Sequence, residues 1–226
     1  MLHSIQQRYG EKLRASDGEI GHVRDFYFDD NNWTVRYLVA DTGGWLSGRL
    51  VLISPQALGH LYPEGKVLLV NLSRQQIEDS PSIDEHKPVS RQLEEEYHRH
   101  YGYAYYAESM PLWGLGGYPV LAPPPRETDP NQQGVDSHLR SARVVASYKV
   151  EANDGVVGAV TDFLIDGRTW VIREIVVECG HWYAGKKVVM STDTVSRISH
   201  DEGTVYVNST KQAFAEASTE TPESRA

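Results

Sequence analysis

Short runs rich in β-branched and aromatic residues, separated by turn residues, dominate two stretches of the chain. Each set of runs begins beside a glycine turn, Asp17-Gly18 or Asp154-Gly155, which indicates a hairpin because glycine adopts positive φ without a Cβ clash. Several short strands without a long helical pattern predict a small barrel or sandwich, in which closure removes exposed sheet edges. The expected strands are 20–28, 33–41, 49–53 and 66–70 in the first stretch, and 156–165, 170–178, 186–190 and 204–207 in the second.

The two stretches are copies of one another. Residues 17–77 align with residues 154–214 at a constant offset of about 137 without a gap, and roughly eighteen of about sixty-one positions are identical. We therefore expect two tandem domains, 1–80 and 138–215, with a connecting segment 81–137 and a polar tail 216–226. The repeated residues expected to fix the backbone and core are Gly18, Gly21, Asp25, Trp33, Trp45 and Gly48, and in the second copy Gly155, Gly158, Asp162, Trp170, Trp182 and Gly185.

The repeated motif resembles the PRC-barrel family. Each copy reads Asp-Gly-x-x-Gly-x-Val-x-Asp-Phe, then an aromatic-led strand, then Gly-x-Trp-x-x-Gly-Arg/Lys-x-Val-x-x-Ser. The resemblance covers about sixty to seventy residues in each copy. It implies a mainly β protein with two tandem small PRC-barrel-like β-barrels, joined by an aromatic-rich linker with one short helix. The same module is shared by the cytoplasmic part of the photosynthetic reaction centre H subunit and by a maturation factor of the small ribosomal subunit.

The connecting segment contains one predicted helix, about residues 90–101, and a run of aromatic residues. Ser90 is a suitable N-cap, and the helix has glutamates near its start and basic residues near its end, which suits the helix dipole. The segment is too aromatic for a solvated linker. We expect it to pack either across the two barrels or onto another protein. The interaction candidates are Tyr97, Tyr101, Tyr103, Tyr105, Tyr106, Trp113 and Tyr118.

Charge and cysteine content narrow the class of protein. The formal net charge is −9, and no segment carries the clustered Lys and Arg of a nucleic-acid footprint, so no nucleic-acid partner is expected. Cys179 is the single cysteine, which excludes an intrachain disulfide. The polar start lacks the apolar run of a signal peptide, and no stretch approaches eighteen apolar residues. These features predict a cytoplasmic protein that is at most peripheral to a membrane.

Candidate chemical groups are sparse, and we predict no catalytic residue, cofactor or metal. His98 and His100 follow glutamates 94–96 at a spacing that metal ligands could use, but zinc would require a further His or Cys, and a solvated helix face is favoured. Cys179 and His181 match ordinary turn residues of the other copy, so a nucleophile is not favoured.

Two repeated polar positions are expected to be structural. Asp25 and Asp162 are each followed by phenylalanine, and we expect them to fix barrel geometry rather than to act as a paired acid and base. Arg36 and Arg173 lie in the middle of predicted strands, where pairing with a carboxylate is favoured over ligand binding.

These observations favour a non-enzymatic protein-interaction or assembly module, an adaptor that docks onto a protein complex or onto a second copy of itself. The resemblance to the H subunit implies association with a membrane complex or a photosynthetic complex like the reaction centre. One alternative, implied by the maturation factor, is an accessory protein in ribosome maturation or RNA processing. The other alternative, based on the His and Glu helix, is a stress-related binding protein that responds to a small ligand or a metal.

Overall fold

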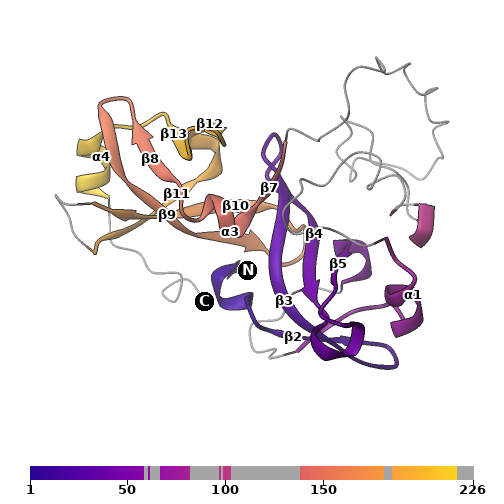
Figure 1. Cartoon of the computed structure of the whole chain (residues 1–226). Coiled ribbons are helices and arrows are strands. Elements are labelled where there is room, and N and C mark those ends of the chain that lie inside the picture. The colour runs from indigo at the N-terminus through magenta and orange to yellow at the C-terminus, as the bar shows by residue number, and fades with distance from the viewer. Residues whose placement is uncertain are drawn as a thin grey trace, which may run out of the picture.

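The computed structural model describes residues 1–58, 61, 67–81, 97, 99–102, 138–180 and 185–217. These residues form two β-sheets, one from each repeat, with a few short helices (Figure 1). The mainly β fold class predicted from the sequence is therefore confirmed. None of the helices in the described part of the chain combines the length and apolar character needed to cross a membrane.

The first sheet, which we call the first module, contains the strands of the first repeat. They lie in the order β5-β4-β3-β2-β6, and neighbours are antiparallel except for β2 and β6, which are parallel. The hairpin predicted at Asp17-Gly18 joins β2 to β3. The strands are β2 (Lys12–Ala15), β3 (Gly18–Asp29), β4 (Thr34–Asp41), β5 (Leu50–Ile53) and β6 (Val67–Leu69).

The second sheet, the second module, repeats this order and adds one strand at its edge. Its order is β11-β10-β9-β8-β13-β12, and the pair β8 and β13 is parallel, as β2 and β6 are. The edge strand β12 was not predicted from the sequence. The strands are β8 (Lys149–Ala152), β9 (Gly155–Asp166), β10 (Ile172–Cys179), β11 (Lys187–Ser191), β12 (Val195–Ser199) and β13 (Thr204–Val207).

Short helices connect and terminate the strands. Two α-helices correspond between the repeats, and each begins at a hydroxyl N-cap, Ser73 or Thr210, which accepts a backbone hydrogen bond. The helices are η1 (Gln6–Arg8), η2 (Gly43–Leu46), η3 (Pro55–Ala57), α1 (Arg74–Glu78), α3 (Ala142–Val145), η5 (Thr192–Thr194) and α4 (Lys211–Glu216). Of the predicted helix 90–101, Tyr97 and residues 99–101 are helical, and the rest lies outside the described residues.

Two repeated glycines permit a close approach between neighbouring strands. A Cβ atom on Gly21 would lie 1.9 Å from the carbonyl oxygen of Asp41, and one on Gly158 would lie 2.0 Å from that of Glu178. Real Cβ atoms do not approach backbone oxygens so closely, so any side chain here would push the long strand of the module away from its partner. This explains why both copies carry glycine at this position.

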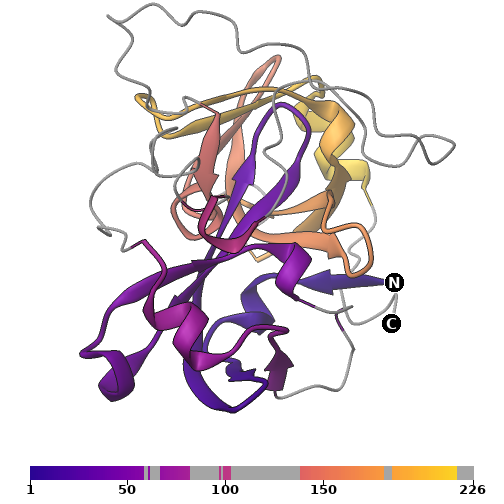
Figure 2. The ribbon, with the colours of Figure 1, turned by 90° about the vertical axis from the view of Figure 1, so that its right-hand side faces the viewer.

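Each module also takes a strand from outside its own repeat. The N-terminal strand β1 (Leu2–Ser4) pairs with β9 of the second module, and β7 (Leu139–Ser141) pairs with β3 of the first. Figure 1 shows β7 running alongside β3, and in Figure 2 the N-terminal strand lies at the boundary between the two modules. The expected domain limits 1–80 and 138–215 follow the repeats along the chain, whereas in space each repeat supplies one arm to the other module.

Candidate functional site: the clasps between the modules

Asp162 on β9 holds the N-terminal arm against the second module. Its Oδ2 atom accepts a hydrogen bond from Ser4 Oγ at 2.5 Å, and its Oδ1 atom accepts one from the Gln6 backbone N–H at 2.9 Å. The neighbouring Phe163 N–H also donates to Oδ1, at 2.7 Å. Asp162 and Ser4 are both buried. We call this arrangement the second clasp.

Asp25 on β3 holds the other arm in the same way. Ser141 Oγ donates to its Oδ2 atom at 2.5 Å, and the Arg143 and Phe26 backbone N–H groups donate to Oδ1 at 3.1 and 2.7 Å. The Arg143 guanidinium donates to the carbonyl oxygen of Arg24 at 2.8 Å and stacks over the ring of Tyr9. This is the first clasp.

Burial raises the pKa of both clasp carboxyls. Desolvation is the largest cause at Asp25 and at Asp162, and the hydrogen bonds from the serine hydroxyl and the backbone N–H groups oppose it without cancelling it. A carboxylate that receives three hydrogen bonds in a buried position is a structural anchor, because every polar atom around it depends on it as an acceptor. The expectation that these aspartates fix geometry therefore extends beyond their own barrels to the contact between the modules.

A third contact lies between the clasps and joins the two sheets directly. Thr34 and Val171 form an isolated antiparallel bridge. Its two hydrogen bonds run from Val35 N–H to the Trp170 carbonyl at 2.9 Å and from Ile172 N–H to the Trp33 carbonyl at 2.7 Å. Both tryptophans have φ of 58°, and each is the counterpart of the other in the repeat.

The bridge and the two clasps together indicate an approximate two-fold relation between the modules. Each clasp aspartate and each group that donates to it has its counterpart, at the repeat offset, in the other clasp, and the bridge exchanges corresponding residues. This is the self-complementary pattern of an isologous interface. In such an interface, when residue i of one unit contacts residue j of the other, residue j of the first unit also contacts residue i of the other. Here the pattern occurs within one chain.

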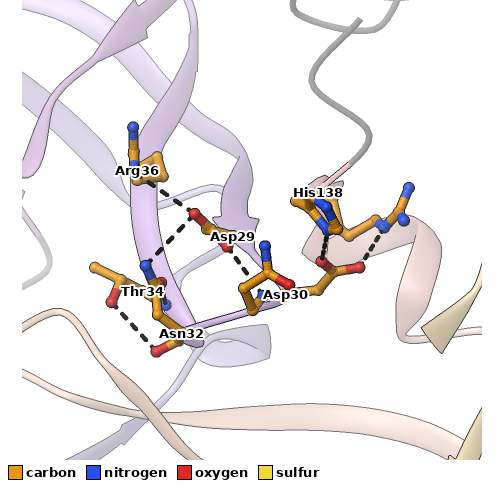
Figure 3. A network of polar contacts seen from close by, with 8 residues as sticks. Asp29, Asp30, Asn32, Thr34, Arg36 and His138 are labelled. Carbon is orange, nitrogen blue, oxygen red and sulfur yellow. Dashed lines mark hydrogen bonds and ion pairs between the residues drawn. The ribbon is translucent and has the colours of Figure 1, made fainter. Parts of the chain in front are cut away.

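The two-fold relation breaks down at the corner after β3. Asp30 accepts hydrogen bonds from His138 Nδ1 at 3.0 Å and from Arg140 Nε at 2.7 Å (Figure 3). The counterpart of Asp30 is Gly167, and the ring of His3 lies where a side chain at that glycine would project. The first clasp is therefore reinforced by charge, and the second by close packing.

The ion pair predicted for Arg36 is present beside this corner. Arg36 Nη1 lies 3.6 Å from Asp29 Oδ2, and Figure 3 shows the pair at the start of β4. Asn32 caps the same turn, because its Oδ1 atom accepts a hydrogen bond from the Thr34 N–H at 3.0 Å. This part of the chain is a structured turn.

Two of the aromatic candidates lie in the described part of the chain, and both pack on the outer face of the first module. The Tyr97 hydroxyl accepts a hydrogen bond from the Ser54 N–H at 2.7 Å, and its ring meets Tyr37 edge-on at 5.3 Å. Tyr101 lies 4.7 Å from Tyr97, and its hydroxyl donates to the Gln76 carbonyl at 3.3 Å. Tyr103, Tyr105, Tyr106, Trp113 and Tyr118 lie outside the described residues.

Tyr97→Ala is expected to destabilise the protein by roughly 3–5 kcal/mol, because it removes a buried aromatic ring and the acceptor of the Ser54 N–H. Tyr97→Phe, which removes only the acceptor, should cost about 1–2 kcal/mol. The matched variant Tyr101→Phe should cost less, since its hydroxyl bond is long and exposed. Urea unfolding of the three variants measures these differences, and an unchanged midpoint for Tyr97→Ala would contradict the docking described here.

The repeated tryptophans and glycines among the described residues lie at packed positions or at turns. Trp33 stacks on Phe28 with ring centres 5.5 Å apart, Trp170 is buried, and Trp45 lies under the Arg74 guanidinium. Trp182, the counterpart of Trp45, lies outside the described residues. The remaining repeated glycines lie at turns: φ is 72° at Gly48 and 83° at Gly185, and Gly18 and Gly155 begin their strands.

Among the described residues, the groups with candidate chemistry do not assemble into a reactive site, and His181 and glutamates 94–96 lie outside the described residues. Burial raises the pKa of the Cys179 thiol, which disfavours the thiolate that a nucleophile requires. The described residues contain no group of three or more His, Cys, Asp or Glu side chains placed to hold a metal ion. Of the two helix histidines, His100 contacts the Gln76 carbonyl through Nε2 at 3.0 Å, and His98 lies outside the described side chains.

The sequence analysis missed the serines that complete the clasps, although a signal was available. Leu2-His3-Ser4 and Leu139-Arg140-Ser141 share leucine and serine at the same offset as the rest of the repeat. Extending the alignment toward the N-terminus would have paired Ser4 with Ser141. It would not have shown that each serine donates a hydrogen bond to the aspartate of the other module.

Comparison with known proteins agrees with the repeat and with the fold. The family model of the PRC-barrel domain matches residues 10–76 and 148–214, which together make up more than half of the chain. No curated protein matches the chain. Asp25 and Asp162 lie within the matched regions, whereas the arms that bind them, β1 and β7, lie just before those regions. The chain therefore belongs to the PRC-barrel domain family and carries two copies of the domain in tandem.

Proposed function

We propose that this protein is a non-catalytic adaptor that holds two PRC-barrel domains in one fixed arrangement and presents them together to a protein complex. PRC-barrel domains are interaction and assembly modules. The observation that carries the proposal is the reciprocal exchange of arms, in which β1 pairs with β9 and β7 pairs with β3.

Fixed pairing matters to an adaptor because of the entropy of binding. Two domains on a flexible linker lose orientational freedom when both engage a partner, whereas two domains already held by clasps and a backbone bridge do not. The buried hydrogen bonds of Asp25 and Asp162 serve this pre-organisation directly. The partner that we propose is a membrane-associated complex, by analogy with the reaction centre H subunit, to which this protein would bind from the aqueous side.

Affinity purification of the tagged protein from its native cells, at low and at high salt, tests the proposal. We expect a stoichiometric protein partner in the purified material, identified by mass spectrometry and by the size of the complex. The variant with Ser4→Ala and Ser141→Ala together serves as the comparison, because it removes one hydrogen bond from each clasp and leaves both apolar cores intact. Recovery of the partner should fall in this variant.

Two results would overturn the proposal. Recovery of a monomer or homodimer without a partner at both salt concentrations would contradict the adaptor function. Salt-dependent recovery of ribosomal particles would instead support the alternative function in ribosome maturation.

A further inference from the structure

The two modules differ at one sheet edge. In the second module β13 lies between β8 and β12, whereas in the first module β6 pairs with β2, and on its other side the described residues form one isolated bridge, between Leu58 and Val70. Both edges begin alike: Asn71 N–H donates to the Ala57 carbonyl and Asn208 N–H to the Thr194 carbonyl, each at 2.7 Å. The two chains diverge after this point.

The first repeat diverges because its chain turns toward the other module. Leu61, the counterpart of Ile198 in β12, is not in a strand, and its N–H donates to the Gly167 carbonyl of the second module at 3.1 Å. The residue that would continue the ladder opposite Leu68 is thus used in the contact between modules. Among the described residues, the edge of β6 therefore has no strand like the one that covers β13.

The side chains on this edge are exposed and apolar. Leu69 is 62% exposed and Val67 is 41% exposed, whereas Thr204, the counterpart of Val67, is 6% exposed. Tyr206, the counterpart of Leu69, is covered by the Arg197 guanidinium from β12 at 4.0 Å. The second module therefore shows what a strand at this position covers.

Positive charge adjoins the exposed edge. Lys12 and Arg14 on β2 lie directly opposite Val67 and Leu69 in the parallel ladder, so their side chains project from the same face of the sheet. Both are exposed, and neither forms an ion pair or side-chain hydrogen bond with the described residues. Glu19 of β3 lies opposite Arg14 in the antiparallel ladder, so these groups leave a net positive charge beside the two exposed apolar residues. In a chain of net charge −9, this favours an acidic partner segment.

We propose that the outer edge of β6 binds an extended segment of a partner protein as an added antiparallel strand. The segment would place apolar residues toward the barrel, as β12 does, and glutamate or aspartate on the outward face. There the aliphatic stems would cover Val67 and Leu69, and the carboxylates would reach Lys12 and Arg14. Main-chain hydrogen bonds supply affinity in this mode of recognition, and the alternating side chains supply specificity. The inference rests on the proposed adaptor function and names its contact surface.

A blocked heptapeptide of alternating valine and glutamate is the probe for this edge. Titration into the isotopically labelled full chain should shift the backbone amide signals of β6 and β2 and protect the outward-pointing amides of Val67 and Leu69 from exchange. A peptide with lysine in place of glutamate should bind at least about tenfold more weakly, because it meets Lys12 and Arg14 with like charge. Equal binding of the two peptides would overturn the charge argument.

Two matched variants locate the site. Leu69→Lys should weaken peptide binding by at least about tenfold, whereas Val156→Lys, at an apolar residue of the second module that is 52% exposed, should leave it unchanged. Thermal unfolding checks that both variants remain folded. Undiminished binding to Leu69→Lys would overturn the inference, as would protection of β6 by concentration-dependent dimerisation alone, which would assign the edge to a second copy of the chain.

These outcomes are separable from the test of the adaptor function. A native complex whose formation does not depend on Leu69, together with an unresponsive β6, would overturn this surface and leave the adaptor function standing. If β6 binds the peptide but no native partner is recovered with the protein, the adaptor function would be overturned and this binding surface would stand.

Discussion

Gly158→Ala is expected to destabilise the protein by roughly 3–5 kcal/mol or more, enough to unfold a marginally stable domain. The added Cβ would lie 2.0 Å from the Glu178 carbonyl oxygen, which belongs to the neighbouring strand β10. Relief requires β9 and β10 to separate, and β9 carries both Asp162 and the paired arm β1. The loss should therefore reach the clasp as well as the sheet.

Urea unfolding of Gly158→Ala and of its counterpart Gly21→Ala measures this effect. Gly44→Ala is the matched control, because no atom lies within 4 Å of a Cβ there and its backbone does not require positive φ. We expect the control to change the free energy of unfolding by less than about 1 kcal/mol. If Gly158→Ala were as stable as the control, the close approach of β9 and β10 would be wrong.

Asp162→Ala is expected to cost roughly 3–5 kcal/mol, because three donors, two of them on buried residues, lose one acceptor together. These donors are the Ser4 hydroxyl and the N–H groups of Gln6 and Phe163, and each unsatisfied buried donor costs about 1–3 kcal/mol. Asp162→Asn keeps an oxygen for the two N–H groups and should cost about 1 kcal/mol. Amide exchange in the N-terminal arm should accelerate in Asp162→Ala and little in Asp162→Asn.

The stability of Asp162→Asn relative to wild type should also depend on pH. Burial raises the pKa of Asp162 above its usual 3.8. At a pH between 3.8 and this raised pKa, the folded protein therefore binds more protons than the unfolded chain. This carboxyl therefore contributes stability below pH 3.8 that is lost as the pH rises through the raised pKa. As the pH rises through this range, wild type should lose stability relative to Asp162→Asn. It should likewise lose stability relative to Asp25→Asn.

Unfolding free energies measured between pH 3 and pH 8 test this pH dependence. The exposed residue Asp201 supplies the control, since Asp201→Asn removes a carboxyl without changing a clasp. A constant difference between wild type and Asp162→Asn across the range would show that the buried carboxyl titrates as it does in the unfolded chain.

The strands predicted from the sequence agree with the structure where pairing is local. The long strands 20–28 and 156–165 appear as β3 and β9, and the last expected strand of the second copy appears as β13 with the predicted limits 204–207. These segments carry β-branched and aromatic residues and pair with neighbours along the chain, so composition and turn residues suffice to predict them. The PRC-barrel resemblance depends on the same residues.

The strands that were missed pair with distant partners or lie at an edge. β1 and β7 have three residues each, with polar side chains among them, and their partners lie in the other repeat. β12 is short and rich in polar residues, and it lies at the edge of its sheet, where it pairs with β13 alone. Nothing in their local composition distinguishes them from loops.

The sequence by itself determined that two PRC-barrel domains lie in tandem, because the glycines, tryptophans and aspartates of the repeat act through short-range backbone geometry. Only the tertiary structure decided what these residues do between the modules. Asp25 and Asp162 could be identified as structural from their repetition, but their partners Ser141 and Ser4 lie 116 and 158 residues away in sequence. Long-range pairing depends on how two finished sheets fit together. The same fit turned Leu61 toward Gly167, and among the described residues no strand covers the edge of β6 as β12 covers β13.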